Sequence, residues 1–469
     1  MPLVTVVTAV VAAAAGSGMI LSTERQRIQH LLRRAGFGYS ADELREYVAL
    51  GLDGTIDRLL NPERVDDSAA EAAAAAYRDA ALQERGALLA SWHTRLVQTK
   101  RPLLEKTTYF WHDHFATGIR KVNGPSFMLV QNETIRAGAL GKFRDLVLAM
   151  TRDPAMMIWL DNRDNVAKAP NENYARELME LFTLGEGVLY TERDVKEAAR
   201  ALTGWRLTTA KPAPDAKFPV ATGVSLVARQ FDNGMKTVLG KSGKFDDIDV
   251  VGIVTSKREC AEYIGTKLWR FFAVPDPTDA MIQRTTDAYF ANDTSIREML
   301  RVILRSPEMY SDDAYRWRIK SPVEQVIHPL RAFGLTDRAA RTARDTQVQG
   351  QVLFDPPSPA GWDWGEAWIN SNTLLARANF ANDITRRGRA GQWVDAAALL
   401  QANNATRTAA QAVDFALDLI VGGDVDPDTR ATLIEHVGGT HYDFAQASKS
   451  GALQGLFYLV LTMPLAQLA

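Results

Sequence analysis

Signals for the start of an α-helix recur along this chain, and they constrain its fold more than any other feature does. Ser40-Ala-Asp-Glu43 and Ser256-Lys-Arg-Glu259 have the spacing of capping boxes, in which a hydroxyl and a carboxylate satisfy backbone N–H groups at a helix start. Pro154 and Pro322 each follow an N-capping residue and stand in the first helical turn, where proline is tolerated. The sequence therefore predicts a mostly α-helical protein.

Apolar residues recur at helical spacing over most of the chain and extend this prediction. Residues 68–99 are rich in alanine and predict one long helix or a pair. The other expected helices cover 24–35, 101–116, 126–139, 142–151, 171–184, 192–203, 257–272, 277–291, 294–304, 322–333, 372–387, 393–402, 407–421, 427–436 and 450–463. No low-complexity linker interrupts residues 19–469, so we expect a single large multi-helix domain there, with a looser helical subdomain from about residue 390.

Strand signal is scarce. The best candidates are residues 222–229 and 235–239, which alternate or are rich in β-branched residues and are separated by Phe-Asp-Asn-Gly. A turn of this kind between two such segments predicts one small β-hairpin. The expected fold class is therefore all-α, mostly helical, with a single small hairpin.

Charge balance and cysteine count exclude several classes of function. The chain has 54 basic and 56 acidic side chains and a net charge of −2, so no basic excess is available to hold a phosphate backbone and no nucleic-acid partner is expected. The single cysteine, Cys260, rules out an intramolecular disulfide and a multi-cysteine metal site. The sequence also lacks a G-x-S-x-G elbow, a P-loop, a Rossmann glycine pattern and an H-E-x-x-H motif.

Residues 1–18 form an apolar extension without charge, for which three interpretations stay open. A start codon assigned too early would make Met19 the true first residue and leave the protein in the cytoplasm. A signal peptide would export the protein, for example to the periplasm, although the basic segment that normally precedes the apolar run is missing. A membrane anchor needs ~20 strongly apolar residues. This run is instead rich in alanine, threonine and glycine, so we expect no stable membrane insertion.

Residues 171–185, NENYARELMELFTLG, carry the most informative pattern for function. On a helix, one of its faces is apolar and consists of Tyr174, Leu178, Leu181 and Phe182. The opposite face is polar and consists of Asn173, Arg176, Glu177 and Glu180. Glu177 and Glu180 lie three residues apart and can converge on one ligand or metal. Arg176 and Glu180 also have the spacing of an ordinary surface ion pair, so this face is either solvated or lines a cleft.

The segment 101–117 contains His112-Asp113-His114, which suggests a metal site at first sight. Side chains two residues apart on a helix diverge by about 200°, so one ion cannot easily bind both imidazoles. His114 falls on the buried face of the expected helix, whereas His112 points toward the opposite edge. The favoured alternative to a metal ligand is a buried histidine that is hydrogen-bonded to a polar neighbour.

Two further groups could contribute to a cleft. His30 and Arg34 lie in an expected helix that Gly36 closes, off its apolar face. Trp362 and Trp364 belong to the loop DPPSPAGWDWG at 355–365, which is dense in aromatic side chains. These tryptophans could stack on a sugar ring or anchor the loop, and anchoring is the favoured interpretation.

Seven blocks of sequence, in this order, resemble the bacterial domain-of-unknown-function-1800 family. They are HLLRRAGFG (30–38), FWHDHFAT (110–117), NENYARELMELFTLG (171–185), KTVLG (236–240), KLWRFF (267–272), RIKSPVEQV (318–326) and PPSPAGWDWGEAWINSNTLLAR (356–377). The resemblance covers nearly everything from about residue 22 onward. It implies no reaction, because the family is named for lacking one.

The resemblance does imply a setting and a set of polar positions. Members are often exported and often encoded beside a sulfatase-like family, which suggests work at the cell envelope or on polysaccharides. The matching polar positions are His30, Arg34, His114, Asn171, Asn173, Arg176, Glu177 and Glu180. Many relatives carry His-Asp before the Gly-x-Lys-Thr turn, whereas here Phe231 precedes Asp232. Any work done by that histidine in relatives is therefore absent or relocated in this chain.

The first hypothesis is an enzyme, for example a hydrolase, that performs acid/base chemistry on a polar, glycan-like substrate. In it, Glu177 is the general acid or base, Glu180 stays ionised beside Arg176, and His114 orients one of the two acids. The expected substrate-binding residues are His30, Arg34, Asn173, Trp362 and Trp364. A metal-dependent variant uses His114, Glu177 and Glu180 as ligands.

The second hypothesis is a non-catalytic binding or scaffold protein associated with the envelope. In it, the same histidine, arginine, asparagine and glutamate side chains form a structural polar network. The sequence leaves both hypotheses open, and it names no cofactor.

Overall fold

The computed structural model describes residues 21–187, 189–210, 216–386, 388 and 391–469. The apolar extension 1–18 and Met19 lie outside these ranges, and so does the choice between their interpretations. The first α-helices are α2 (Glu24–Arg34), α3 (Ala41–Leu60), α4 (Ser68–Ala75), α5 (Arg78–Ala81), α6 (Arg85–Gln98), α7 (Pro102–His114), α8 (Ile119–Val122), α9 (Pro125–Gly138), α10 (Phe143–Thr151), α11 (Pro154–Trp159), α12 (Asn173–Glu177) and α13 (Glu192–Ala201). The later α-helices are α14 (Asp247–Thr255), α15 (Arg258–Phe272), α16 (Asp279–Ala291), α17 (Ile296–Arg305), α18 (Pro322–Ala332), α19 (Thr342–Val348), α20 (Ser371–Thr385), α21 (Ala396–Ala402), α22 (Ala409–Val421), α23 (Pro427–His436), α24 (Phe444–Ser450) and α25 (Ala452–Thr462).

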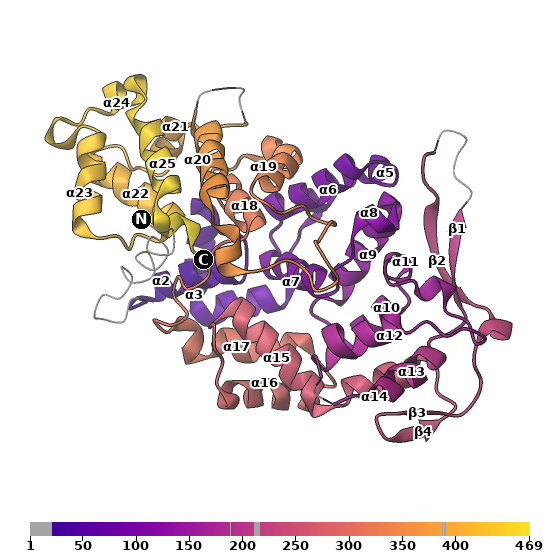
Figure 1. Ribbon diagram of the computed structural model, residues 1–469. Coiled ribbons are helices and arrows are strands. Elements are labelled where there is room, and N and C mark those ends of the chain that lie inside the picture. The colour runs from indigo at the N-terminus through magenta and orange to yellow at the C-terminus, as the bar shows by residue number, and fades with distance from the viewer. Residues whose placement is uncertain (1–20, 188, 211–215, 387, 389–390) are drawn as a thin grey trace.

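These helices dominate the structure (Figure 1) and confirm the predicted mostly helical fold class. Residues 68–99 form three helices, α4 to α6, instead of the one or two expected. Helix α14, which the sequence did not indicate, precedes α15 and consists largely of aliphatic residues. The expected subdomain from about residue 390 stays a prediction.

Helix starts follow the sequence signals at one predicted capping box but not at the other. At α3, the Ser40 hydroxyl accepts from the backbone N–H of Glu43 at 3.2 Å, and the Glu43 carboxylate accepts from the Ser40 N–H at 2.8 Å. The box predicted at Ser256 is wrong, because this residue ends α14 and its hydroxyl donates to the Ile253 carbonyl at 2.8 Å. Helix α15 then begins at Arg258 without a side-chain cap.

The strand prediction found two of the strands but paired them wrongly. Strand β1 (Trp205–Ala210) pairs antiparallel with β2 (Val220–Leu226), and β3 (Lys236–Val238) pairs antiparallel with β4 (Lys241–Gly243). The two segments expected to form one hairpin therefore belong to two separate sheets, because each has a strand partner on its other side in the sequence. Both sheets lie at the end of the molecule opposite α21–α25 (Figure 1).

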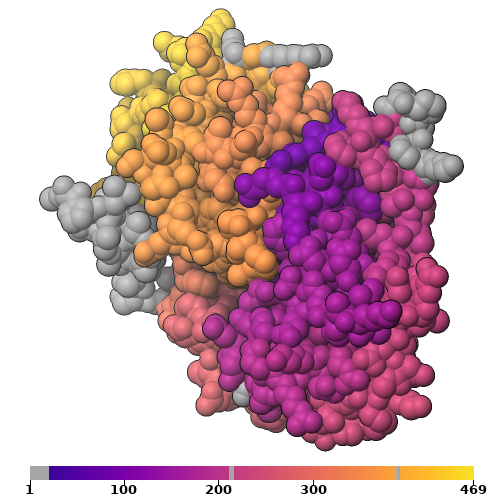
Figure 2. Space-filling view, turned by 45° about the vertical axis from the view of Figure 1, so that its right-hand side comes forward, coloured from indigo at the N-terminus to yellow at the C-terminus, as the bar shows by residue number. Residues whose placement is uncertain are grey.

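A single hydrophobic cluster connects buried residues from Ile28 in α2 to Ala466 near the end of the chain. Helix α7 runs through the middle of the molecule (Figure 1), with Leu103, Phe110 and Trp111 almost completely buried. Segments far apart in sequence meet around it, and α6 packs against α18 and α19. Figure 2 shows this joining on the surface, where the orange C-terminal part lies directly against the purple N-terminal part. None of the described helices combines the length and the apolar character that crossing a bilayer requires.

Candidate functional site

The segment expected to be one α-helix over 171–184 changes its winding half-way. Helix α12 ends at Glu177 and continues directly into a π-helix, η3 (Leu178–Thr183), in which the Leu184 N–H donates to the Met179 carbonyl at 2.8 Å. Tyr174, Leu178 and Phe182 are buried, in agreement with the predicted apolar face. Short π-helical turns are rare and often occur at functional sites.

The imidazole of His114 contacts the backbone of this segment. Its Nε2 lies 3.0 Å from the Phe182 carbonyl oxygen and its Nδ1 lies 2.9 Å from Lys267 Nζ. The imidazole therefore donates through Nε2–H to the carbonyl and accepts from the lysine at Nδ1. Burial and the charge of Lys267 hold the pKa of His114 well below its usual range. Both ring nitrogens are occupied, and neither meets Glu177 or Glu180, so the predicted orienting role of His114 toward these acids is not formed.

The two glutamates lie on a more open part of the molecule. Glu177 is half-buried, and its carboxylate forms no hydrogen bond or ion pair with another residue in the described ranges. Burial and the neighbouring Glu180 raise its pKa. Glu180 accepts from the Tyr190 hydroxyl at 3.2 Å. Two half-exposed acids side by side, one of them unpaired, keep an acid/base role at this place open as a prediction.

Arg176 does not hold Glu180 as the sequence predicted. It forms ion pairs with Glu192 at 2.6 Å and with Glu172 at 3.3 Å. Asn173 is exposed, and its side chain lies 3.4 Å from Asp161 Oδ2. Because these polar groups are paired with neighbours on the outside of the molecule, they form a surface network and line no cleft together with His114.

The predicted metal-ligand set is not assembled either. No group of three or more histidine, cysteine, aspartate or glutamate side chains in the described part of the chain is placed to hold a metal ion. His112 and His114 also diverge as helical spacing predicts, since His112 Nε2 accepts from the Phe354 N–H at 3.0 Å on another segment. The metal variant with His114, Glu177 and Glu180 as ligands is therefore wrong for this arrangement of side chains.

His30 and Arg34 are buried inside α2 and do not reach these acids. His30 Nε2 lies 3.0 Å from the Met309 carbonyl oxygen, and the Arg34 guanidinium donates to the carbonyls of Phe271 and Phe272 at 3.1 Å each. Burial first, and then the neighbouring Arg34, lower the pKa of His30. Both side chains serve backbone carbonyls, so the structure does not bring them into the predicted cleft.

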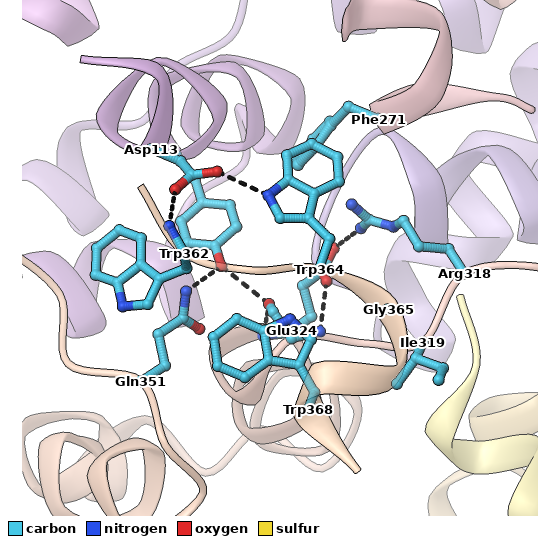
Figure 3. A pocket seen from close by; sticks show the side chains of 12 residues that line it. Asp113, Phe271, Arg318, Ile319, Glu324, Gln351, Trp362, Trp364, Gly365 and Trp368 are labelled. Carbon is cyan, nitrogen blue, oxygen red and sulfur yellow. Dashed lines mark hydrogen bonds and ion pairs between the residues drawn. The ribbon is translucent and has the colours of Figure 1, made fainter. Parts of the chain in front are cut away.

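The tryptophan loop is anchored on α7 through Asp113. Asp113 Oδ1 accepts from the Trp362 backbone N–H at 2.8 Å, and Oδ2 accepts from the Trp364 indole N–H at 2.9 Å (Figure 3). Gly361 has a φ of +91°, and a Cβ there would lie 2.3 Å from Asp113 Oδ1, so only glycine fits this close approach. These contacts anchor the loop on α7, and the role of its tryptophans in stacking on a sugar stays a prediction.

The same loop also encloses a pocket with an empty volume of about 340 Å³, which we call the tryptophan pocket. This volume includes space that is open to solvent, and the part that a water molecule can enter is about 20 Å³, room for about one water. Its aromatic lining comes from Trp362, Trp364, Trp368, Tyr109 and Phe271, and its charged lining comes from Asp113, Arg318 and Glu324 (Figure 3). Trp364 is 37% exposed, whereas Trp362 and Trp368 are buried. The pocket therefore combines aromatic faces with charge, and one of its indoles is open to solvent.

The two carboxyl groups of the pocket have pKa values that are shifted in opposite directions. Burial raises the pKa of Asp113 to about 6, against the lowering effect of its two hydrogen bonds. Burial acts in the same direction on Glu324, but Arg318 and Lys106 outweigh it and hold the pKa of this carboxyl well below its usual range. Glu324 forms close ion pairs with both cations and also accepts from the Ser321 N–H at 2.9 Å. Around pH 6, Asp113 exchanges its proton while Glu324 stays ionised.

The comparison with protein families identifies the chain. The model of the family described as "Protein of unknown function (DUF1800)" matches residues 30–468, which is nearly the whole chain. The chain belongs to this family. No curated protein and no solved structure gives a match. The predicted resemblance is thereby confirmed. Membership of the DUF1800 family does not indicate which reaction, if any, the protein catalyses.

In this DUF1800 chain, sequence reasoning found two pocket tryptophans and missed the charged residues beside them. Asp113 stands between the two histidines of the H-x-H pattern and was passed over because the pattern was considered only for metal binding. Arg318 and Glu324 lie in the block RIKSPVEQV, which matches the family but is ordinary in local pattern. The usable signal was the Ser321 cap, since the capping carboxylate that follows it is Glu324.

Proposed function

We propose that a sugar-like polar ring binds at the open side of the tryptophan pocket, where Trp364 is exposed, and that Asp113 performs acid/base chemistry on it. Asp113 donates the proton, while Glu324 remains the ionised carboxylate of the pair. The observation that carries this proposal is the meeting of two carboxyl groups and three indoles in one pocket, with the pKa values of the two carboxyl groups shifted in opposite directions. Pairs of acids whose surroundings push their pKa values apart are the usual basis of acid/base catalysis by carboxyl groups.

The aromatic lining supports a ring-shaped ligand. Indole faces pack against flat apolar surfaces, and their N–H groups bind polar atoms at the same time. The Trp364 indole is placed by the Asp113 carboxylate at its N–H and by the Phe271 ring, whose centroid lies 5.3 Å away. A partly exposed indole that is already fixed on two sides loses little freedom when a ring stacks on it.

The proposal assigns the role of the acid to Asp113 on α7, in place of Glu177 on the polar face of α12 and η3. Asp113 has two tryptophans bonded to its carboxylate. The function class expected from the sequence, acid/base chemistry on a glycan-like substrate, is kept. Its residues change.

A non-catalytic binding protein is the second candidate, and one observation favours it. Both oxygens of Asp113 already accept hydrogen bonds from the tryptophan loop, which is what a purely structural anchor does. In that case the pocket binds its ligand without turning it over. Substitution of Asp113 would then change the affinity for the ligand, and neither the variant nor the wild-type chain would convert it.

Ligand binding tests the pocket itself. We expect Trp364→Ala to weaken the binding of a neutral monosaccharide or oligosaccharide at least about fivefold in isothermal titration calorimetry, because a stacking face worth about 1 kcal/mol is lost. Trp205→Ala is the matched control, since Trp205 is a half-buried indole on β1 that packs against Arg152 outside the pocket. Equal losses in both variants, or a loss only in Trp205→Ala, would contradict the assignment of the pocket.

A further inference from the structure

Positive charge is in excess behind the tryptophan pocket. Five buried cationic side chains act on the carboxylate of Glu324, and they are Arg34, Lys106, Arg318, Lys320 and Arg377. Among the residues that the structure describes, Glu324 is the only carboxylate with which any of the five forms an ion pair. One buried carboxylate thus faces five buried cationic side chains, and burial lowers the pKa of the two lysines among them.

Several of the remaining N–H groups of these cations bind backbone carbonyls, and one N–H of Arg34 lies 3.5 Å from the oxygen of Ala469, the last residue of the sequence. Arg34 donates to backbone carbonyls of α15, Lys320 donates to the Ala466 carbonyl at 2.9 Å, and Arg377 donates to the Lys320 carbonyl at 2.9 Å. Carbonyl oxygens satisfy the hydrogen bonds but carry no full negative charge. Burial, and then neighbouring cations such as Arg318 and Arg33, lower the pKa values of Arg34 and Lys320 well below their usual ranges.

Arg318 brings this excess to the wall of the pocket. Its guanidinium lies 4.5 Å from the centroid of the Phe271 ring and pairs with Glu324, and both residues line the pocket with it (Figure 3). Its Nε–H is buried and has no hydrogen-bond partner among the described residues. A buried guanidinium N–H without an acceptor on the protein needs a water or a ligand to supply one.

We propose that the ligand of the tryptophan pocket carries an acidic group, a carboxylate or a sulfate ester, that pairs with Arg318. This inference rests on the proposed function, because it names the class of ring that the pocket takes: an acidic sugar. An anion next to Arg318 offsets part of the buried positive charge and gains charge-assisted hydrogen bonds in a poorly solvated place. Protonation of Asp113, which also lines the pocket, removes one negative charge that would repel the group.

Matched pairs of sugars test the inference on the full chain. Calorimetry compares D-galacturonate with its methyl ester, and glucose 6-sulfate with glucose, so that each pair differs in the acidic group. We expect the carboxylate, the sulfate ester or both to bind at least about tenfold more tightly than the neutral partner. The arm that shows the preference identifies the acidic group. In Arg318→Gln the preference should fall to about twofold or less, and in Arg318→Lys it should persist in part.

Small anions separate failure of this inference from failure of the proposed function. Sodium acetate and sodium sulfate replace sodium chloride at constant ionic strength. Anion binding that depends on Arg318, without binding of any sugar, supports the acidic-group inference and overturns the sugar-binding function. Equal affinity for acidic and neutral sugars in the wild-type chain overturns the inference and leaves the function standing. If neither sugars nor anions bind the wild-type chain, the acidic-group inference and the sugar-binding function are both overturned. This outcome does not depend on whether any variant folds.

Discussion

Asp113→Asn is expected to lower turnover of a sugar substrate by about 100- to 10,000-fold, the range that a general acid contributes. The asparagine oxygen can still accept from the Trp362 N–H, but the side chain no longer exchanges a proton near pH 6. Release of reducing ends from the sugar that calorimetry identifies measures the loss. Glu177→Gln is the control, because it makes the same acid-to-amide change at a half-buried carboxylate outside the pocket. Its rate should stay within about twofold of wild type.

The pH profile gives a second readout for the same residue. Burial raises the pKa of Asp113 to about 6, so the proton that it donates is present below that pH and lost above it. We expect the rate to fall about tenfold for each pH unit above 6. A normal rate in Asp113→Asn together with a large loss in Glu177→Gln would return the acid to the polar face of α12 and η3. Altered affinity without any turnover in wild type would favour the binding protein.

Glu324→Gln is expected to lower the free energy of unfolding by about 3 to 5 kcal/mol, because it leaves buried cations without their counter-ion. The carboxylate pairs with Lys106 and Arg318, both of them almost fully buried. Even with Glu324 present, burial lowers the pKa of Lys106 to about 7. The charged form of this lysine is therefore only weakly favoured, and it depends on the Glu324 carboxylate. Urea denaturation at pH 7 measures the change, with Glu177→Gln again as the control at about 0.5 kcal/mol or less.

The pH dependence of this effect has a definite sign. The pKa of Glu324 is depressed in the folded chain, so its contribution is fully present above the unfolded-state value of about 4 and is lost as the pH falls below it. The gap between wild type and Glu324→Gln should therefore shrink on acidification below pH 4. A gap below about 1 kcal/mol at pH 7, or one that grows with acid, would show that Glu324 is not the counter-ion of these cations.

Local patterns predicted the helical fold because caps and apolar spacing act over a few residues. The capping box at Ser40 and the cap at Ser321 form as the sequence indicated. The box predicted at Ser256 does not form, because the Ser256 hydroxyl donates to a carbonyl of the preceding helix α14. Strand pairing failed for a related reason. The partner of β2 is β1, which ends ten residues before β2 begins, and no local signal ranks that pairing above the Asn-Gly turn.

The candidate site depended on contacts that local patterns do not contain. His114 was expected beside Glu177 and Glu180. Its imidazole instead forms hydrogen bonds with a backbone carbonyl of the π-helix and with Lys267. Asp113 became a candidate only when the loop of Trp362 and Trp364, some 250 positions later, was seen to close on it. Residues that meet across such a separation are joined by the packing of α7 at the centre of the fold, which a single sequence does not state.

Hydrogen–deuterium exchange of the full chain, with and without the sugar that binds most tightly, tests the central claim most directly. Ligand in the tryptophan pocket should slow exchange of the backbone N–H groups in residues 354–368 and at the start of α18, and leave residues 171–184 unchanged. Slowed exchange confined to residues 171–184, with the tryptophan loop unaffected, would place the ligand on the polar face of α12 and η3 and contradict the account.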